Sequence, residues 1–230
     1  MFDIDVLLPD LWSILGAVPV TLAMALMIFV FSTIIGSLYA LIERRQVPVL
    51  REFVVAYKVT FKGIPMVIVI FLAYYGIPPA LQFLASLAGV KFNAHAMPNW
   101  IIIIVALTAC VAAFQAEVVK GALNSFDTGQ ADAAYSLGYK SSQLFRRILF
   151  PQMIVAAIPD LANSFMVIMK ALSLAFAIEV VDIFAQAQLT AALNFYYLEA
   201  FVIAVVIYMV IAYIVTHVAD RMERALRVWT

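Results

Sequence analysis

Long apolar stretches, separated by short polar ones, run through most of the chain. A membrane-spanning helix needs about 20 consecutive, largely apolar residues. Five stretches meet this requirement, and they cover about Trp12–Ile42, Phe53–Ile77, Pro98–Glu117, Gln152–Val180 and Phe195–Ala219. We expect a break inside the second stretch at Gly63-Ile64-Pro65, because glycine and proline disfavour the interior of a helix. The pattern therefore predicts an all-α integral membrane protein with five transmembrane helices.

The composition supports this class. Hydrophobic residues make up 66% of the 230 positions and charged residues only 12%, and the mean hydropathy is +1.05. A soluble domain carries roughly 25% charged residues, so this chain could not cover its surface as a soluble protein. The formal net charge of zero gives no overall basic field that would attract nucleic acid.

The basic residues indicate how the chain crosses the membrane. They gather after the first, third and fifth stretches, at Arg44, Arg45 and Arg51, at Lys120, Lys140, Arg146 and Arg147, and at Arg221, Arg224 and Arg227. The opposite side has Lys91 alone. Lysine and arginine favour cytoplasmic loops, so we expect the N-terminus outside and the C-terminus in the cytoplasm.

A polar segment at about 128–151 lies between the third and fourth stretches, on the expected cytoplasmic side. We expect two short helices joined by a turn at Gly138. The first has Asp132 in its first turn and a face of small residues (Ala131, Ala133 and Ala134). The second is expected to have Ser141 as its N-cap, and it carries an apolar stripe (Leu144, Phe145, Ile148 and Leu149). Such a segment could lie on the inner leaflet as an amphipathic elbow, or it could dock into a groove of a partner protein.

The spacing in this segment resembles a known signature. Asp132-Ala133-Ala134 is followed after three residues by Gly138, and after nine more by Ile148, Phe150 and Pro151. This closely resembles the EAA motif of ABC importer permeases, E-A-A-x3-G-x9-I-x-L-P, with aspartate replacing glutamate and phenylalanine replacing leucine. The resemblance implies that the 128–151 segment docks onto an ATPase subunit through Asp132, Ala133, Ala134, Gly138, Phe145 and Pro151.

Further stretches resemble the polar amino acid permeases of that family. The sequence from Phe61 to Pro65 is similar to FRGTP, Gln115–Gly121 to AEIVRGG, and Met169–Ala175 to LLKDTSLA without its acidic residue. The phrase SLAFAIEVVDIF is closest to importers of cystine and related sulfur amino acids. The resemblance covers nearly the whole chain and implies one permease domain, 1–230, with the type I ABC importer fold in a bacterial cell membrane.

The resemblance also implies a set of partners. It predicts a second permease subunit, identical or related, two ATP-binding subunits that hold ATP and magnesium, and an extracytoplasmic protein that delivers a polar amino acid such as L-cystine. The chain itself is expected to bind no cofactor. It lacks the G-x4-G-K-[ST] loop that cradles ATP phosphates and the spacing of a metal site, and its single cysteine is Cys110. We therefore do not expect an enzyme.

Polar residues within the apolar stretches are candidates for a substrate path, because each is costly to place in lipid. Asn163, Lys170 and Ser173 share one face of the fourth stretch, and Gln115 and Lys62 are further candidates. Lys170 could instead pair with Glu179 or Glu199. Glu117 could pair with Lys120 three residues on, or with the arginines of the 128–151 segment.

Two other functions stay open at this stage. An ion-coupled secondary transporter would favour internal repeats with broken helices in matching halves, and no such repeat is visible in this sequence. A structural membrane subunit without a substrate is the second alternative.

Overall fold

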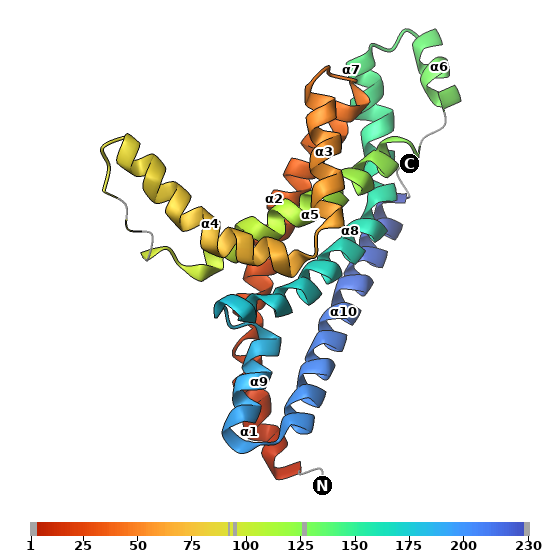
Figure 1. Ribbon diagram of the computed structural model, residues 1–230. Helices are drawn as coiled ribbons and strands as arrows, with labels where there is room; N and C mark the ends of the chain where they lie inside the picture. The colour runs from red at the N-terminus through yellow and green to blue at the C-terminus, as the bar shows by residue number, and fades with distance from the viewer. Residues whose placement is uncertain (1–3, 92, 94–95, 126–127, 228–230) are drawn as a thin grey trace.

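The computed structural model describes residues 4–91, 93, 96–125 and 128–227, and within these ranges all regular structure is helical (Figure 1). The α-helices are α1 (Ile4–Leu15), α2 (Val18–Arg44), α3 (Leu50–Gly63), α4 (Met66–Leu87), α5 (Asn99–Leu123), α6 (Thr128–Ser136), α7 (Ser141–Leu144), α8 (Phe150–Leu172), α9 (Ile183–Asn194) and α10 (Tyr197–Arg227). A π-helix, η2 (Phe145–Leu149), joins α7 to α8, and a 3₁₀-helix, η3 (Ser173–Ile178), follows α8.

Five helical segments in the described residues are long and apolar enough to cross a membrane, as the sequence predicts. They cover Leu7–Arg44, Met66–Leu87, Asn99–Leu123, Ser141–Ile178 and Tyr197–Arg227. The fourth is longer than expected because α7, η2 and α8 follow one another without a break, so the second short helix of the 128–151 segment continues directly into the membrane span.

The second span is placed differently from the prediction. The break at Gly63-Ile64-Pro65 is present, since Ile64 and Pro65 are both extended with ψ near 133°, and a residue before proline disfavours the helical region. The break separates two helices instead of kinking one, so the crossing segment is α4 and not Phe53–Ile77. The amphipathic helix α3, with Lys58 and Lys62, packs instead against α2 and α5.

Helices α2 and α5 form the most closely packed pair of the bundle. Gly36 permits this approach, because a Cβ atom at that position would lie 2.8 Å from the backbone nitrogen of Ala116. The main apolar core joins α2 and α5 to α8, α9 and α10. A second cluster, which includes Ala40, Leu123, Ala134 and Leu144, attaches the 128–151 segment to the ends of α2 and α5.

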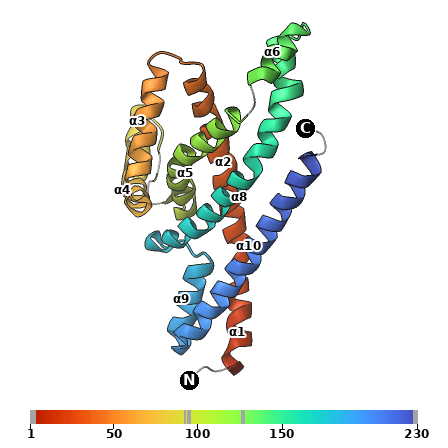
Figure 2. The same ribbon diagram turned by 90° about the vertical axis from the view of Figure 1, so that its right-hand side faces the viewer.

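Helix α4 leaves the bundle and extends to one side (Figure 1). Only Val69, Ile70 and Ala73 are buried along it, whereas large side chains such as Leu72, Phe83 and Leu87 are exposed. In both views the ends of α2, α3, α5 and α7 gather with α6 at one end of the molecule, and α1 and α9 lie at the opposite end (Figure 2). The expected basic side of the membrane is thus one end of the bundle.

Candidate functional site

The 128–151 segment forms a defined elbow. Helix α6 ends at Ser136, and the turn that follows has Gly138 with a φ of +80°, a left-handed conformation that glycine adopts without strain. The Gly138 N–H donates to the Tyr135 carbonyl at 2.9 Å, and the Tyr139 N–H donates to the Ala134 carbonyl at 3.0 Å. The predicted turn is therefore present at the predicted residue.

The start of the second helix differs from the prediction. Lys140, and not Ser141, takes the N-cap position of α7, and its backbone N–H donates to the Gln143 side chain at 2.9 Å. The Ser141 hydroxyl instead accepts a hydrogen bond from the Tyr135 hydroxyl at 3.3 Å. Together with the 2.9 Å bond from Gln152 to Gln130, this contact fixes α6 against the helix that enters the membrane.

The small residues of α6 face two directions. Asp132 and Ala133 are exposed, but Ala134 is only 3% exposed and packs into the cluster with Leu144 and Leu149. Ala134 thus belongs to the packing of this chain itself, and Ala131 packs against the same cluster. This corrects the expectation that Ala131, Ala133 and Ala134 form one face of small residues, because Ala133 lies on the exposed side.

The other predicted docking residues also have defined places. Phe145 is 37% exposed in the π-helix, and its ring lies 5.8 Å from that of Phe150. Pro151 is half-buried in the first turn of α8. Leu137 is 78% exposed and Tyr135 49% exposed beside the Gly138 turn. The sequence analysis did not predict either residue as a docking residue. The position of Leu137 next to a glycine turn and outside the apolar stripe could have indicated that its side chain is exposed.

A cavity of about 400 Å³ lies between α5 and α8, and it holds one of the predicted path residues. Asn163 lines it with Asp160 and Ser164 of α8 and Glu117 of α5, among apolar side chains such as Phe114. Asp160 and Asn163 are exposed and three residues apart, so they share a face. We call this space the α5–α8 cavity.

The other candidates for the path lie elsewhere. Lys170 is exposed, and among the described residues it takes part in no ion pair, so the alternative pairing with Glu179 or Glu199 is absent. The Ser173 hydroxyl donates to the Lys170 carbonyl at 2.6 Å, where α8 passes into η3. Gln115 is completely buried at the α2–α5 contact.

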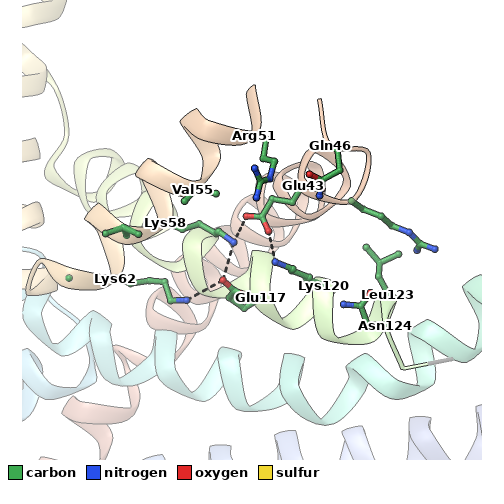
Figure 3. A pocket seen from close by; sticks show the side chains of 13 residues that line it. Glu43, Gln46, Arg51, Val55, Lys58, Lys62, Glu117, Lys120, Leu123 and Asn124 are labelled. Carbon is green, nitrogen blue, oxygen red and sulfur yellow. Dashed lines mark hydrogen bonds and ion pairs between the residues drawn. The ribbon is translucent and has the colours of Figure 1, made fainter. Parts of the chain in front are cut away.

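Charged side chains of α2, α3 and α5 form a connected cluster (Figure 3). Glu117 accepts hydrogen bonds from Lys58 at 3.0 Å and Lys62 at 3.3 Å. Glu43 pairs with the same Lys58 and accepts a hydrogen bond from Lys120 at 2.7 Å. Neither alternative for Glu117, pairing with Lys120 or with the arginines of the 128–151 segment, is present among the described residues. Glu117 and Lys120 each bind a residue of an earlier helix.

This cluster lines a cavity of about 730 Å³ that we call the charged cavity. Its basic side chains are Arg44, Arg51, Lys58, Lys62 and Lys120, and its acidic ones are Glu43 and Glu117. Burial of Lys58 acts to lower its pKa, but the hydrogen bonds and charges of the two glutamates outweigh burial and raise the pKa above its usual value. Lys58 therefore stays charged at neutral pH.

The described residues contain no group of three or more histidine, cysteine, aspartate or glutamate side chains that could hold a metal ion. Cys110 is a buried free thiol. A phosphate-binding loop of the form G-x4-G-K-[ST] is absent from the sequence.

The chain is similar to several curated bacterial proteins over most of its length. It is 34% identical to the probable amino-acid permease protein YxeN of Bacillus subtilis, covering 93% of this chain and 91% of that protein. It is 33% identical to the probable amino-acid ABC transporter permease protein PatM of Vibrio harveyi, with coverage of 94% and 93%. It is 29% identical to the L-cystine transport system permease protein TcyL of Bacillus subtilis, with coverage of 92% and 86%.

Solved structures show the same fold. A chain of an amino acid ABC transporter crystallised with histidines superposes with a TM-score of 0.82 at 23% identity, covering 98% of this chain and 99% of that one. An inward-facing MetNI methionine ABC transporter gives a TM-score of 0.72 at 21% identity, with coverage of 95% and 98%. The fold is that of a type I ABC importer permease.

Residues 45–228 match the family model described as the inner membrane component of binding-protein-dependent transport systems. Members of this family are membrane-embedded transport subunits and not enzymes. With its five apolar helices, the protein is a multi-pass protein of the bacterial inner membrane. The chain belongs to the family of inner membrane components of binding-protein-dependent transport systems.

Proposed function

We propose that this protein is the permease subunit of an ATP-driven importer for a polar amino acid. The family membership and the similarity to amino-acid permeases over more than nine-tenths of the chain support this function. L-Cystine is one candidate substrate, because TcyL is among the relatives and the stretch from Ser173 to Phe184 resembles cystine importers. ATP and magnesium are bound by the partner subunits.

The 128–151 segment is the part that docks onto the ATPase. The observation that carries this proposal is the exposure of Leu137 and Tyr135 beside the Gly138 turn, at the end of a helix that Ala134 packs against Leu144 and Leu149. Contact of a large apolar side chain with water is unfavourable, and a partner groove that covered the 78% exposed Leu137 would gain roughly 25 cal/mol for each Å² of apolar surface buried. The second helix of the segment continues through η2 into α8, so movement of the ATPase is transmitted to a membrane span.

A second permease subunit packs beside this one. Five spans with α4 extending away from the bundle do not enclose a path by themselves. The exposed apolar side chains of α4, which include Leu72, Phe83 and Leu87, need either lipid or another subunit against them. Two copies, or this chain with a related one, close the path around a central axis.

We propose that the substrate contacts lie along α8. Asp160 in the α5–α8 cavity would attract the ammonium group of an amino acid, Asn163 would supply an amide, and Lys170 would attract a carboxylate. Asp160 and Lys170 are ten residues apart, which is about 15 Å along a helix axis. That separation exceeds the size of one zwitterionic head, so the two charges serve successive positions along the path.

The decisive experiment is the ATPase activity of the reconstituted complex, with its binding protein, over a panel of cystine, arginine, glutamine and histidine. We expect at least one of these amino acids to stimulate hydrolysis and to accumulate in the vesicles. Transport without ATP or partner subunits would overturn the proposed function, as would a complex that hydrolyses ATP with no response to any amino acid.

Docking is tested separately by Leu137→Asp, which places a charge in the contact. We expect co-purification of the ATPase subunit and stimulated hydrolysis to be lost. Leu193→Asp is the matched control, since Leu193 is 87% exposed on α9 at the opposite end of the molecule. Retention of the ATPase by Leu137→Asp would remove this residue from the interface.

A further inference from the structure

The charged cavity has more positive charge than its internal ion pairs need. The lining has five basic side chains and two carboxylates, and Glu52 outside the lining pairs with Arg51, so the formal excess is two positive charges. If the cluster served only to join α2, α3 and α5, the charges would be expected to balance, because an excess of like charges in one place is repulsive. The lining is thus suited to an anion.

Several donors of the cavity are available to such an anion. Lys62 and Lys120 each donate a hydrogen bond to a carboxylate, while an ammonium group has three donors. Their side chains are 37% and 46% exposed, and they lie in the cavity wall with Arg51 (Figure 3). Arg51 donates at 2.8 Å to Glu52, a neighbour that is itself 71% exposed, and such surface pairs are weak.

The position of the cavity selects the kind of anion. It lies where two candidate spans end, at Arg44 and at Leu123, which is the level of lipid headgroups on the basic side of the protein. The same wall carries the apolar side chains Val55 and Val59, the latter 69% exposed. Basic pockets between membrane helices on the cytoplasmic side bind anionic headgroups, and adjacent apolar side chains suit the start of an acyl chain.

We propose that the charged cavity binds a phosphate-bearing anion, supplied by the headgroup of an anionic phospholipid. Arg51 offers a planar pair of donors to two phosphate oxygens, and Lys62 of the same helix and Lys120 of α5 add positive charge. A bound phosphate would contact both α3 and α5 and so hold the short helix α3 against the bundle. The charged cavity shares Glu117 with the α5–α8 cavity, but none of the proposed substrate contacts on α8 lines it.

The test uses the purified, delipidated transporter complex in neutral detergent. Phosphatidylglycerol, phosphatidylcholine or inorganic phosphate is titrated in, and bound lipid is counted by native mass spectrometry while thermal stability is followed. We expect phosphatidylglycerol to bind and stabilise at concentrations where phosphatidylcholine does not. Arg51→Gln should weaken its apparent affinity about tenfold, since hydrogen bonds to charged groups are among the stronger ones, and Arg51→Lys should restore part of it.

Arg45→Gln is the matched control: it removes one positive charge at the C-terminal cap of α2, six residues before Arg51 in the chain, but Arg45 does not line the cavity. Phosphatidylglycerol binding that is equal in Arg51→Gln, Arg45→Gln and the unmodified complex would overturn the site. Stabilisation by inorganic phosphate alone, lost in Arg51→Gln, would retain the anion site and overturn the lipid as its source. Failure of all three additives to bind would overturn the site itself.

Discussion

A Cβ atom built on Gly36 of α2 would lie 2.7 Å from the Cβ atom of Gln115 on α5. The two helices therefore meet where only a glycine fits. Replacement of glycine by alanine in a helix gains up to about 1 kcal/mol, but overpacking of a tight contact costs roughly 1–3 kcal/mol. Because the contact involves backbone atoms of α5 as well, the second effect should win.

We therefore expect Gly36→Ala to lower the thermal stability of the purified complex. Gly76→Ala is the control, since Gly76 lies in helix α4 with nothing within 4 Å of its built Cβ atom. Unfolding midpoints in the same detergent compare the two directly. Equal or higher stability of Gly36→Ala would show that α2 and α5 can separate at no cost.

Gln115 itself gives a second prediction. Its amide nitrogen and oxygen are buried and have no hydrogen-bond partner among the described residues. An unsatisfied buried polar group costs about 1–3 kcal/mol, so Gln115→Leu, of similar volume, should stabilise the protein by about 1 kcal/mol. If Gln115 contacts substrate in another conformation, uptake should fall while stability rises. A loss of stability would contradict the packing shown.

The charged cluster predicts unequal effects of its two glutamates. Glu43→Gln removes a carboxylate that is 7% exposed and pairs with both Lys58, itself 9% exposed, and Lys120, and breaking a buried pair costs about 3 kcal/mol. Glu117→Gln should cost less than about 1 kcal/mol, because the Glu117 side chain is 43% exposed and water replaces the lost contacts. Denaturation in detergent measures both, and the reverse order would refute the assigned partners.

The cluster also has a defined pH dependence on the alkaline side. The folded-state pKa of Lys58 lies above its ordinary value of 10.5. A raised lysine pKa means that the stability it contributes is fully present below the ordinary value and is lost as pH rises through the folded-state value. Changes of pH around neutrality should therefore leave the contribution of Lys58 to the free energy of unfolding unchanged.

The sequence predicts the five spans because a bilayer imposes a length of apolar chain that local composition reveals. The Gly138 turn can also be predicted from local sequence, since glycine adopts the positive φ of this turn without strain. The partners of Lys58 and Lys120 are not local: Glu117 lies 59 residues from Lys58, and Glu43 lies 77 residues from Lys120. The burial of Ala134 depends in the same way on how α6 packs against α7 and η2. The pattern of apolar residues within the nine residues of α6 does not predict that packing.

Gly138 predicts how the elbow responds to substitution. Its Cβ position is open, so the cost of a side chain comes from the φ of +80°, about 1–2 kcal/mol for an ordinary residue and less for asparagine. Gly138→Val should distort the turn and reduce stimulated ATPase activity, whereas Gly138→Asn should retain most of it. Gly121→Val serves as control, because Gly121 is also open but lies in α5 without positive φ. Equal stimulated ATPase activity of Gly138→Val and Gly138→Asn would show that the conformation of this turn does not affect coupling.

Lys170 gives the sharpest test of the substrate path. It is exposed on α8 and joins no ion pair among the described residues, so its removal should not loosen the bundle. Loss of a charge-assisted hydrogen bond to a substrate carboxylate is worth about 1.5–3 kcal/mol, which corresponds to a roughly tenfold or greater fall in uptake at low substrate. Lys170→Ala should therefore reduce uptake while the amount of assembled complex stays constant, and Lys170→Arg should retain part of the activity. Leu174→Ala, four residues on, controls for side-chain truncation in the same region. If assembly fell in step with uptake, Lys170 would be holding subunits together, and the carboxylate would have to meet another group on the path.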